Sequence, residues 1–597
     1  MPLLRHGWIL ILLTGAVLTA APAQPAAPSS TIVWHPWSDA IFAQAKRENK
    51  FVLLDLEAVW CHWCHVMAET TYRDPEVTAL MEQRYLAVRV DQDLRPDLAN
   101  RYEDYGWPAT VIYAPDGTEI VKKQGYIEPR GMVRLLRAVI DDPSPVAAQN
   151  VSHDDAVASE TVLSAERRNA LQKKWLAGYD DKEGGWGTVH KYLDADTIEF
   201  AVRLASRGDA RAAQMARDTL RLEPKLLDPI WGGLDQYSAG GTWDEPHFEK
   251  IISVQADGLR AYALAFAQWG DAADLKTIHA IHGYVRNFLT SPDGVVYVSQ
   301  DADLIPGEHS ADYFSLNDAA RRARGVPRVD RHIYARENGW MISALVQLAE
   351  STGDRTYRTE AERAARWIIA HRSLPDGGFR HDETDAAGPY LGDTLAMGRA
   401  LLGLHQLTQN REWLDRAEAA AKFIQGHFQR KDSAGYAASD TTKAVFPAPR
   451  PQFDENVAVI RFMTALTAVT GNADFRAHAG QGLRWLLAPG VTDDRGFSVA
   501  GLLLAEADAR TDPVHVMILG GTDDPVAQGM FAASLSLSDQ HKLVEWWDRR
   551  RGPAPRGEDI FPEMDRAAAF LCANGACSSP LGSVVALEKR LAKINQP

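Results

Sequence analysis

A short loop pattern recurs six times between residues 164 and 510, and it constrains the fold more than any other feature of the chain. Each copy ends in glycine followed by an apolar or aromatic residue, and Ala/Leu/Arg-rich stretches typical of long helices separate the copies. The copies are Gly185-Trp186, Gly233-Leu234, Gly294-Val295, Gly378-Phe379, Gly435-Tyr436 and Gly496-Phe497. Their spacings are 48, 61, 84, 57 and 61 residues, which fits one helical hairpin per repeat with an insertion in the third interval.

Six helical hairpins can close into a ring or stack as an open solenoid. Six units favour closure, so we predict an all-α (α/α)6 toroid over residues 164–510. The chain has 597 residues, which is too long for one ordinary domain, and the toroid is therefore expected to be one part of a multidomain protein.

The segment 31–142 has an α/β pattern. Apolar runs at 51–56, 85–90 and 111–113 and a fourth run at 119–122 predict strands, and 127–140 predicts a closing helix. Strand, helix, strand, hairpin and helix is the order of a thioredoxin-like domain. A polar, Pro-containing linker is expected at 143–163. A small C-terminal α/β segment is expected at 511–597, with strands near 514–520 and 542–547.

Residues 1–23 resemble a signal peptide. Arg5 and His6 precede an apolar run from Trp8 to Ala20, and Ala21-Pro22-Ala23 supplies small residues for cleavage before Gln24. We therefore expect an exported protein, periplasmic or secreted. After Gln24 no stretch is long and apolar enough to suggest a stable membrane partner. The net charge of −15 gives no basic face for nucleic acid.

The four cysteines form two close pairs, and Cys61 and Cys64 lie where a strand should meet a helix. In that position the helix dipole and the free backbone N–H groups stabilise a thiolate on the first cysteine. Cys61 would attack a disulfide and Cys64 would resolve the mixed disulfide. We also predict that this dithiol faces solvent, which is a poor place for an inert disulfide.

The residues around the pair support a redox site. Asp55 lies six residues before Cys61, on the strand where thioredoxins keep a buried carboxylate, and Pro108 precedes a strand where thioredoxins carry a cis-proline. Trp60 precedes the first cysteine. His62, between the cysteines, could donate to the thiolate and lower its pKa.

Three alternatives fit part of the motif. Cys-x-x-Cys-His matches haem attachment, two Cys and two His could bind zinc, and the pair could be a structural disulfide. The preceding strand, Asp55 and Pro108 argue against haem, and adjacent Cys and His on one helical turn cannot all point at one metal. We therefore predict no metal and no other cofactor. His65 fits a packed helix residue as well as a functional one.

The stretch Trp60-Cys61-His62-Trp63-Cys64-His65-Val66-Met67, with Gly106-Trp107-Pro108, resembles the spermatogenesis-associated thioredoxin-domain (YyaL-like) family. The resemblance continues weakly at 246–250, 301–303, 338–339 and 572–580. It implies a thioredoxin-like domain joined to a six-hairpin, glycosidase-like toroid. It implies no particular reaction, because the substrate of the family is not established.

The toroid offers its own candidate residues, because such rings carry function in the loops at one mouth. His247 and Glu249 could serve as base and acid for sugar chemistry, with Asp301 and Asp303 as further carboxylates and Trp243 as a stacking platform. An Asp before a helix is more often an N-cap, and loop aromatics more often pack the ring.

Cys572 and Cys577 are most simply a local disulfide, and a second redox pair that exchanges electrons with Cys61 and Cys64 is the alternative. The leading hypothesis for the whole chain is an enzyme, a thiol-disulfide oxidoreductase that acts on a disulfide-bearing client or redox partner, with a toroid that binds the client or a glycan. One alternative is a carbohydrate-active enzyme of epimerase or glycosidase type with an accessory redox domain. The other is a non-catalytic binding protein.

Overall fold

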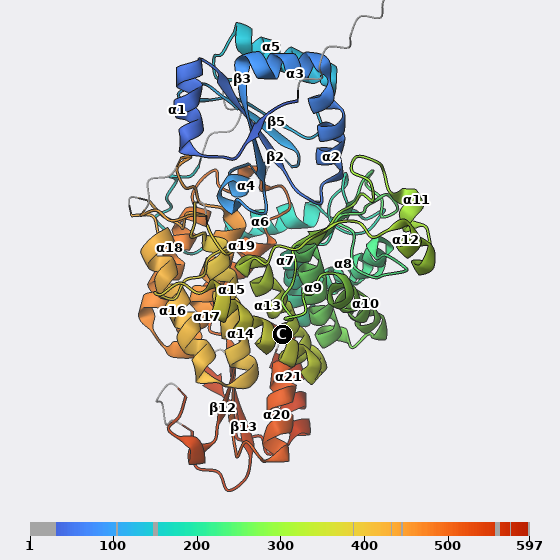
Figure 1. Ribbon diagram of the computed structural model, residues 1–597. Coiled ribbons are helices and arrows are strands. Elements are labelled where there is room, and N and C mark those ends of the chain that lie inside the picture. The colour runs from blue at the N-terminus through green and yellow to red at the C-terminus, as the bar shows by residue number, and fades with distance from the viewer. Residues whose placement is uncertain are drawn as a thin grey trace, which may run out of the picture.

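The computed structural model describes residues 31–102, 106–146, 153–385, 387–431, 433–442, 446–555, 561–573 and 575–594. The expected signal peptide, residues 1–23, lies outside them. Figure 1 shows an α/β domain on one end of a helical ring and a small α/β part on the other end. The predicted fold class, an α/β thioredoxin-like domain followed by an all-α toroid and a small C-terminal α/β segment, is confirmed.

The N-terminal domain is built on a five-stranded sheet of order β1-β3-β2-β4-β5. Strand β2 runs parallel to β3 and antiparallel to β4, and β5 is antiparallel to β4. The elements are β1 (Trp34–His35), α1 (Asp39–Glu48), β2 (Phe51–Glu57), α2 (His62–Glu69), α3 (Pro75–Arg84), β3 (Tyr85–Asp91), α4 (Pro96–Tyr102), β4 (Ala109–Tyr113), β5 (Glu119–Gln124) and α5 (Pro129–Asp141).

Strand β2 is buried along almost its whole length because helices cover both faces of the sheet, and five of its seven residues are apolar. Val52, Leu54 and Leu56 point to the face that α1 and α4 cover. Phe51 and Leu53 point to the face that α2, α3 and α5 cover. Because α2 begins shortly after β2 ends, Cys61 lies at the carboxyl end of this buried strand.

Six helices form the inner wall of the ring and six form the outer wall. Neighbouring inner helices contact one another around the full circle, and α19 contacts α7, so the ring is closed and is not an open solenoid. The inner helices are α7 (Ala195–Ser206), α9 (Ile252–Trp269), α13 (Ala335–Thr352), α15 (Leu391–Thr408), α17 (Phe453–Thr470) and α19 (Ala500–Arg510). The outer helices are α8 (Ala210–Leu222), α10 (Ala272–Phe288), α14 (Arg355–Arg372), α16 (Arg411–Phe428), α18 (Ala473–Leu486) and α6 (Ala165–Ala177), which pairs with α19.

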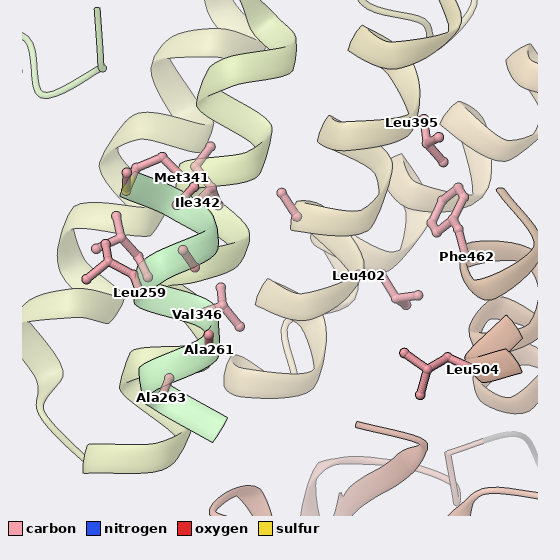
Figure 2. Close-up of a cluster of buried hydrophobic side chains, with 14 of the residues drawn as sticks. Leu259, Ala261, Ala263, Met341, Ile342, Val346, Leu395, Leu402, Phe462 and Leu504 are labelled. Carbon is pink, nitrogen blue, oxygen red and sulfur yellow. The ribbon is translucent and has the colours of Figure 1, made fainter. Parts of the chain in front are cut away.

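Apolar side chains of the inner helices form the core of the ring. Figure 2 labels ten of them, on five of the inner helices: Leu259, Ala261, Ala263, Met341, Ile342, Val346, Leu395, Leu402, Phe462 and Leu504. Small residues let inner helices approach closely: a Cβ at Gly339 of α13 would lie 2.6 Å from the carbonyl carbon of Ala396 in α15. Among the described helices, none is both long and apolar enough to cross a membrane.

The long third interval holds an insertion at the mouth of the ring that faces the N-terminal domain. It contains α11 (Ala311–Phe314), α12 (Asp318–Arg324), β9 (Ser299–Gln300) and β10 (Val329–Asp330), and β9 also pairs with β8 (Lys250–Ile251) of the preceding interval. A second small hairpin at this mouth pairs β6 (Tyr237–Ser238) with β7 (Pro246–His247). The chain segments 247–251 and 301–303 leave these strands toward α2.

The C-terminal part repeats the topology of the N-terminal sheet. Its order is β12-β11-β13-β14, with β11 parallel to β12, β13 antiparallel to β11 and β14 antiparallel to β13. These are the relations of β3-β2-β4-β5. Along the chain, α20 follows β11 as α2 follows β2, and α21 follows β14 as α5 follows β5. The elements are β11 (Val514–Leu519), α20 (Pro525–Leu535), β12 (Lys542–Trp547), β13 (Ala568–Ala573), β14 (Ala576–Cys577) and α21 (Val584–Ile594).

Candidate active site between the thioredoxin-like domain and the ring

Cys61 is the N-cap residue of α2, and its sulfur accepts a hydrogen bond from the backbone N–H of Cys64 at 3.1 Å. The two cysteines form a disulfide. After reduction, the same N–H group and the positive end of the helix would stabilise a thiolate on Cys61. Of the two cysteines, Cys61 is therefore the one whose thiolate this helix start would stabilise.

The expectation of a solvent-facing dithiol is wrong. Cys61 and Cys64 are each only 3% exposed, because the ring covers them. They lie in one apolar cluster with Trp60 of the thioredoxin-like domain and with Ile251 and Val254 of the ring. The sequence could not show this, because the covering residues lie about 190 positions further along the chain.

A carboxylate of the ring insertion holds the redox helix in place. Asp303 lies 2.7 Å from Nδ1 of His62 and 3.1 Å from Nδ1 of His65. Burial raises the pKa of Asp303, but the hydrogen bonds from the two histidines outweigh it and the pKa is about 2. Burial lowers the pKa of His65, but the hydrogen bond to Asp303 and the charges of Asp301 and Asp303 raise it above its usual value. His62 thus contacts Asp303 rather than serving the thiolate directly.

Glu249 approaches the same helix from the ring. Its Oε1 accepts a hydrogen bond from the backbone N–H of His62 at 3.4 Å, one residue after Cys61. Within the described part of the chain, Oε2 is buried without a hydrogen-bond partner, and His247 Nδ1 lies 3.9 Å from it. Burial raises the pKa of Glu249 to about 7, and burial together with the neighbouring histidines lowers the pKa of His247 to about 4. Glu249 can therefore exchange a proton near neutral pH.

Asp55, Trp60 and Pro108, the other residues predicted for the site, all lie in the thioredoxin-like domain. Asp55 is buried and bonded to Arg89 at 3.0 Å. Burial raises its pKa while Arg89 opposes this. Trp60 donates its indole N–H to Asp93 at 2.8 Å. The peptide bond before Pro108 is cis. Asp55 is therefore engaged by Arg89, whereas Glu249 Oε2 has no hydrogen-bond partner among the described residues.

Four of the five toroid candidates come together, but on the redox helix instead of around a sugar cavity. His247, Glu249, Asp301 and Asp303 all lie beside α2. Trp243 does not join them. It is 2% exposed and donates its indole N–H to the backbone carbonyl of Glu183 at 3.1 Å, so its assignment as a stacking platform is wrong.

Trp243→Phe should destabilise the protein by about 1 kcal/mol, because it removes one buried hydrogen bond and keeps most of the packing. Unfolding in urea, monitored by circular dichroism, measures this change in the free energy of unfolding. Trp269→Phe is the control, since the indole of Trp269 has no hydrogen bond among the described residues. Unchanged stability with impaired ligand binding would restore the stacking assignment.

One side-chain group could be considered for a metal ion. His65, Asp301 and Asp303 offer ligand atoms that lie within 4.8 Å of one another. Their atoms are already engaged: Asp303 accepts from His62, His65 and the N–H of Gly307, and Asp301 accepts from the N–H of Asp303. We read the group as an ion-pair network between the two domains.

Cys572 and Cys577 form a disulfide between β13 and β14, at the opposite end of the ring from α2. In the C-terminal sheet the place of Cys61 is taken by Asp524, which caps α20. Cys572 pairs with His515 near the start of β11, whereas α20 begins after the other end of that strand. Thiol-disulfide exchange needs contact between sulfurs, so direct exchange between the two pairs of one molecule is excluded.

Replacing Cys572 and Cys577 by serine together should leave the redox equilibrium of Cys61 and Cys64 unchanged. Equilibration in glutathione buffers, with alkylation of the free thiols and mass analysis, measures the reduced fraction of each pair. A shifted equilibrium for Cys61 and Cys64 in the double variant would show that the pairs communicate after all.

Residues 24–147 match the profile of the Thioredox_DsbH family, described as a protein of unknown function (DUF255). The chain is 28% identical to human spermatogenesis-associated protein 20 over 308 residues, which is 46% of this chain and 39% of the human protein. It spans about half the length of the curated mouse and rat relatives that it matches.

Two further similarities concern the separate parts. The chain is 34% identical over 105 residues to thiol:disulfide interchange protein DsbD 1 of Pseudomonas aeruginosa, which is 17% of this chain and 18% of that protein. A structure of D-mannose isomerase aligns with 13% identity and a TM-score of 0.47, over 59% of this chain and 99% of that chain. The chain is thus similar to spermatogenesis-associated protein 20 over part of its length, and residues 24–147 match the Thioredox_DsbH (DUF255) family model.

Proposed function

We propose that the protein is an exported thiol-disulfide oxidoreductase whose ring controls access to the Cys61–Cys64 pair. The observation that carries the proposal is the disulfide at the N-terminus of α2, enclosed between the redox domain and the ring with Glu249 beside it. A structural disulfide would need neither the helix N-terminus nor a neighbouring carboxyl group that titrates near pH 7.

The Cys61 thiolate attacks one sulfur of the client disulfide, which forms a mixed disulfide and releases the other client sulfur as a thiolate. The Cys64 thiol gives its proton to Glu249 and attacks Cys61, which releases the second client thiolate. The two client thiolates take up the protons, and Cys61 and Cys64 end oxidised. The reverse sequence oxidises a client dithiol.

Export is part of the proposal and is supported by the signal-like residues 1–23. An oxidising compartment would hold the pair as the disulfide between reactions. The partner is then a disulfide-bearing client or a redox protein, and the ring is the surface that selects it.

The alternative of sugar chemistry at His247, Glu249, Asp301 and Asp303 loses support, because all four lie against α2 rather than around an open cavity. The proposed redox function can be tested with Cys64→Ser in the native host, which should accumulate mixed disulfides on Cys61 that mass spectrometry identifies. The matched control is Cys61→Ser/Cys64→Ser, which should trap nothing. Equal capture by both variants, or capture by neither, would leave the binding-protein hypothesis as the better one.

A further inference from the structure

A cavity of about 550 Å³ lies on the axis of the ring, and the redox mechanism does not use it. All six inner helices contribute residues to its wall, and Asn100 of α4 adds a residue of the thioredoxin-like domain. The volume is in the range of small-molecule sites. A larger cavity of about 1390 Å³ lies between the ring and the C-terminal sheet, away from the inner mouth.

Five arginines line the axial cavity, and four of them have carboxylate partners. Arg260 lies 3.2 Å from Asp257, Arg461 bonds Glu199 at 3.0 Å, and Arg336 and Arg495 bond Glu337 and Asp454. Arg399 of α15 is the exception. Within the described residues it has no hydrogen bond and no ion pair, although it lines the cavity.

Arg399 is half-buried, and a guanidinium in such a position loses part of its water without a replacement partner, which costs free energy. Burial and the positive charges of Arg260 and Arg461 lower the pKa of Arg399 to about 10, although the carboxylates of Asp196 and Glu199 oppose them. We therefore expect the guanidinium of Arg399 to pair with an anionic ligand that is not part of this chain.

We propose that the axial cavity binds a sugar acid whose carboxylate pairs with Arg399. A guanidinium and a carboxylate can form two parallel hydrogen bonds, which suits a single bound anion. Among the five wall arginines, one lacks a partner within the described part of the chain, and the wall carries as many carboxylates as arginines, so a monoanion fits better than a dianion such as phosphate. Trp340 offers a ring face, and Ser343 and Asp257 offer partners for hydroxyl groups.

The site is separate from the dithiol but shares a helix with it. Ile251 and Val254, at the start of α9, pack on the cysteine pair, whereas Ser253, Asp257 and Arg260 of the same segment face the cavity. The proposal does not require redox activity and can be tested on the oxidised full chain.

Isothermal titration of the full chain with D-glucuronate, D-glucose and inorganic phosphate tests the proposal. D-glucuronate should bind about tenfold or more tightly than D-glucose, because only the acid supplies the charge-assisted bond. Arg399→Gln should remove this preference, Arg399→Lys should keep part of it, and Arg476→Gln should change nothing. Arg476 is an exposed arginine of outer helix α18, so its replacement changes the charge by the same amount.

Thermal unfolding provides the second measurement. Without ligand, Arg399→Gln should unfold no earlier than the wild type, because it removes an unpaired charge. D-glucuronate should raise the midpoint of the wild type and leave that of Arg399→Gln unchanged. Three results would each overturn the proposal: no D-glucuronate binding at millimolar concentration, equal binding of acid and neutral sugar, or phosphate binding at Arg399 as tight as that of the acid.

Discussion

Asp303→Ala should speed reduction of the Cys61–Cys64 disulfide by a protein dithiol by about 100-fold. Removal of Asp303 leaves His62 and His65 without their acceptor between the two domains. Loss of one partner of a buried pair costs about 3–5 kcal/mol, and every ~1.4 kcal/mol that favours the open form raises its population tenfold. We expect part of this free energy to shift the equilibrium toward an open form, in which the ring no longer covers the dithiol.

Two reductants of different size make the measurement specific. Dithiothreitol is small, and a thioredoxin is a protein that needs the covering segments to move aside. Alkylation of the released thiols at timed intervals gives both rates. The ratio of the protein rate to the dithiothreitol rate should rise in Asp303→Ala, rise less in Asp303→Asn, and stay constant in Asp312→Ala. Asp312 is an exposed aspartate of α11 in the same insertion.

The same contact predicts a dependence on pH. The pKa of Asp303 is about 2, so its stabilising effect is present above its ordinary value of 3.8 and is lost as pH falls toward 2. The pKa of His65 is raised, so its effect is present below 6.5 and is lost as pH rises through the raised value. The wild type should therefore be most tightly closed between about pH 4 and 6.5. Dividing the wild-type reduction rate by the Asp303→Ala rate at the same pH removes the pH dependence of the thiols themselves. Equal acceleration of both reductants by Asp303→Ala would contradict gating by the ring.

Glu249→Gln should slow resolution of the mixed disulfide above pH 7 by about 100-fold, the lower end of general-base effects. Glu249 has a pKa of about 7 and lies at the start of the redox helix, so its ionised form can accept the Cys64 proton. The wild-type rate should rise through pH 7, and this inflection should vanish in the variant. Rapid mixing of reduced protein with a disulfide peptide, quenched with acid, follows the mixed disulfide directly.

Glu245→Gln is the matched control, because Glu245 is exposed and lies four residues away on the same hairpin. The free energy of unfolding of Glu249→Gln distinguishes a catalytic defect from misfolding. Glu249 binds its proton more tightly in the folded state, so the stability that this proton provides is lost as pH rises from 4.5 through 7. Glu249→Gln should therefore be more stable than the wild type above pH 7, by on the order of 3 kcal/mol at most. If Glu249→Gln resolves the mixed disulfide slowly but its rate still rises through pH 7, the proton acceptor is another group.

Much of the architecture followed from local patterns. The six Gly-plus-apolar loops predicted the ring, and the strand before Cys61 predicted the helix that the cysteine caps. The topology of the C-terminal part was missed, although strand, helix, strand, hairpin and helix was again the order of its elements. Its short β14 and the absence of a cysteine at Asp524 removed the usual signals.

The cysteine pair was therefore determined by sequence, but its environment was not. Spacing along the chain placed Cys61 at a helix N-terminus, because a helix start depends on a few neighbouring residues. Only the tertiary structure brought Glu249, Asp301 and Asp303 to that helix, since contacts across 187 to 241 positions leave no periodic trace in a single sequence. The same holds for Arg399: its position on a helix was predictable, but its lack of a partner depends on how six helices close around one axis.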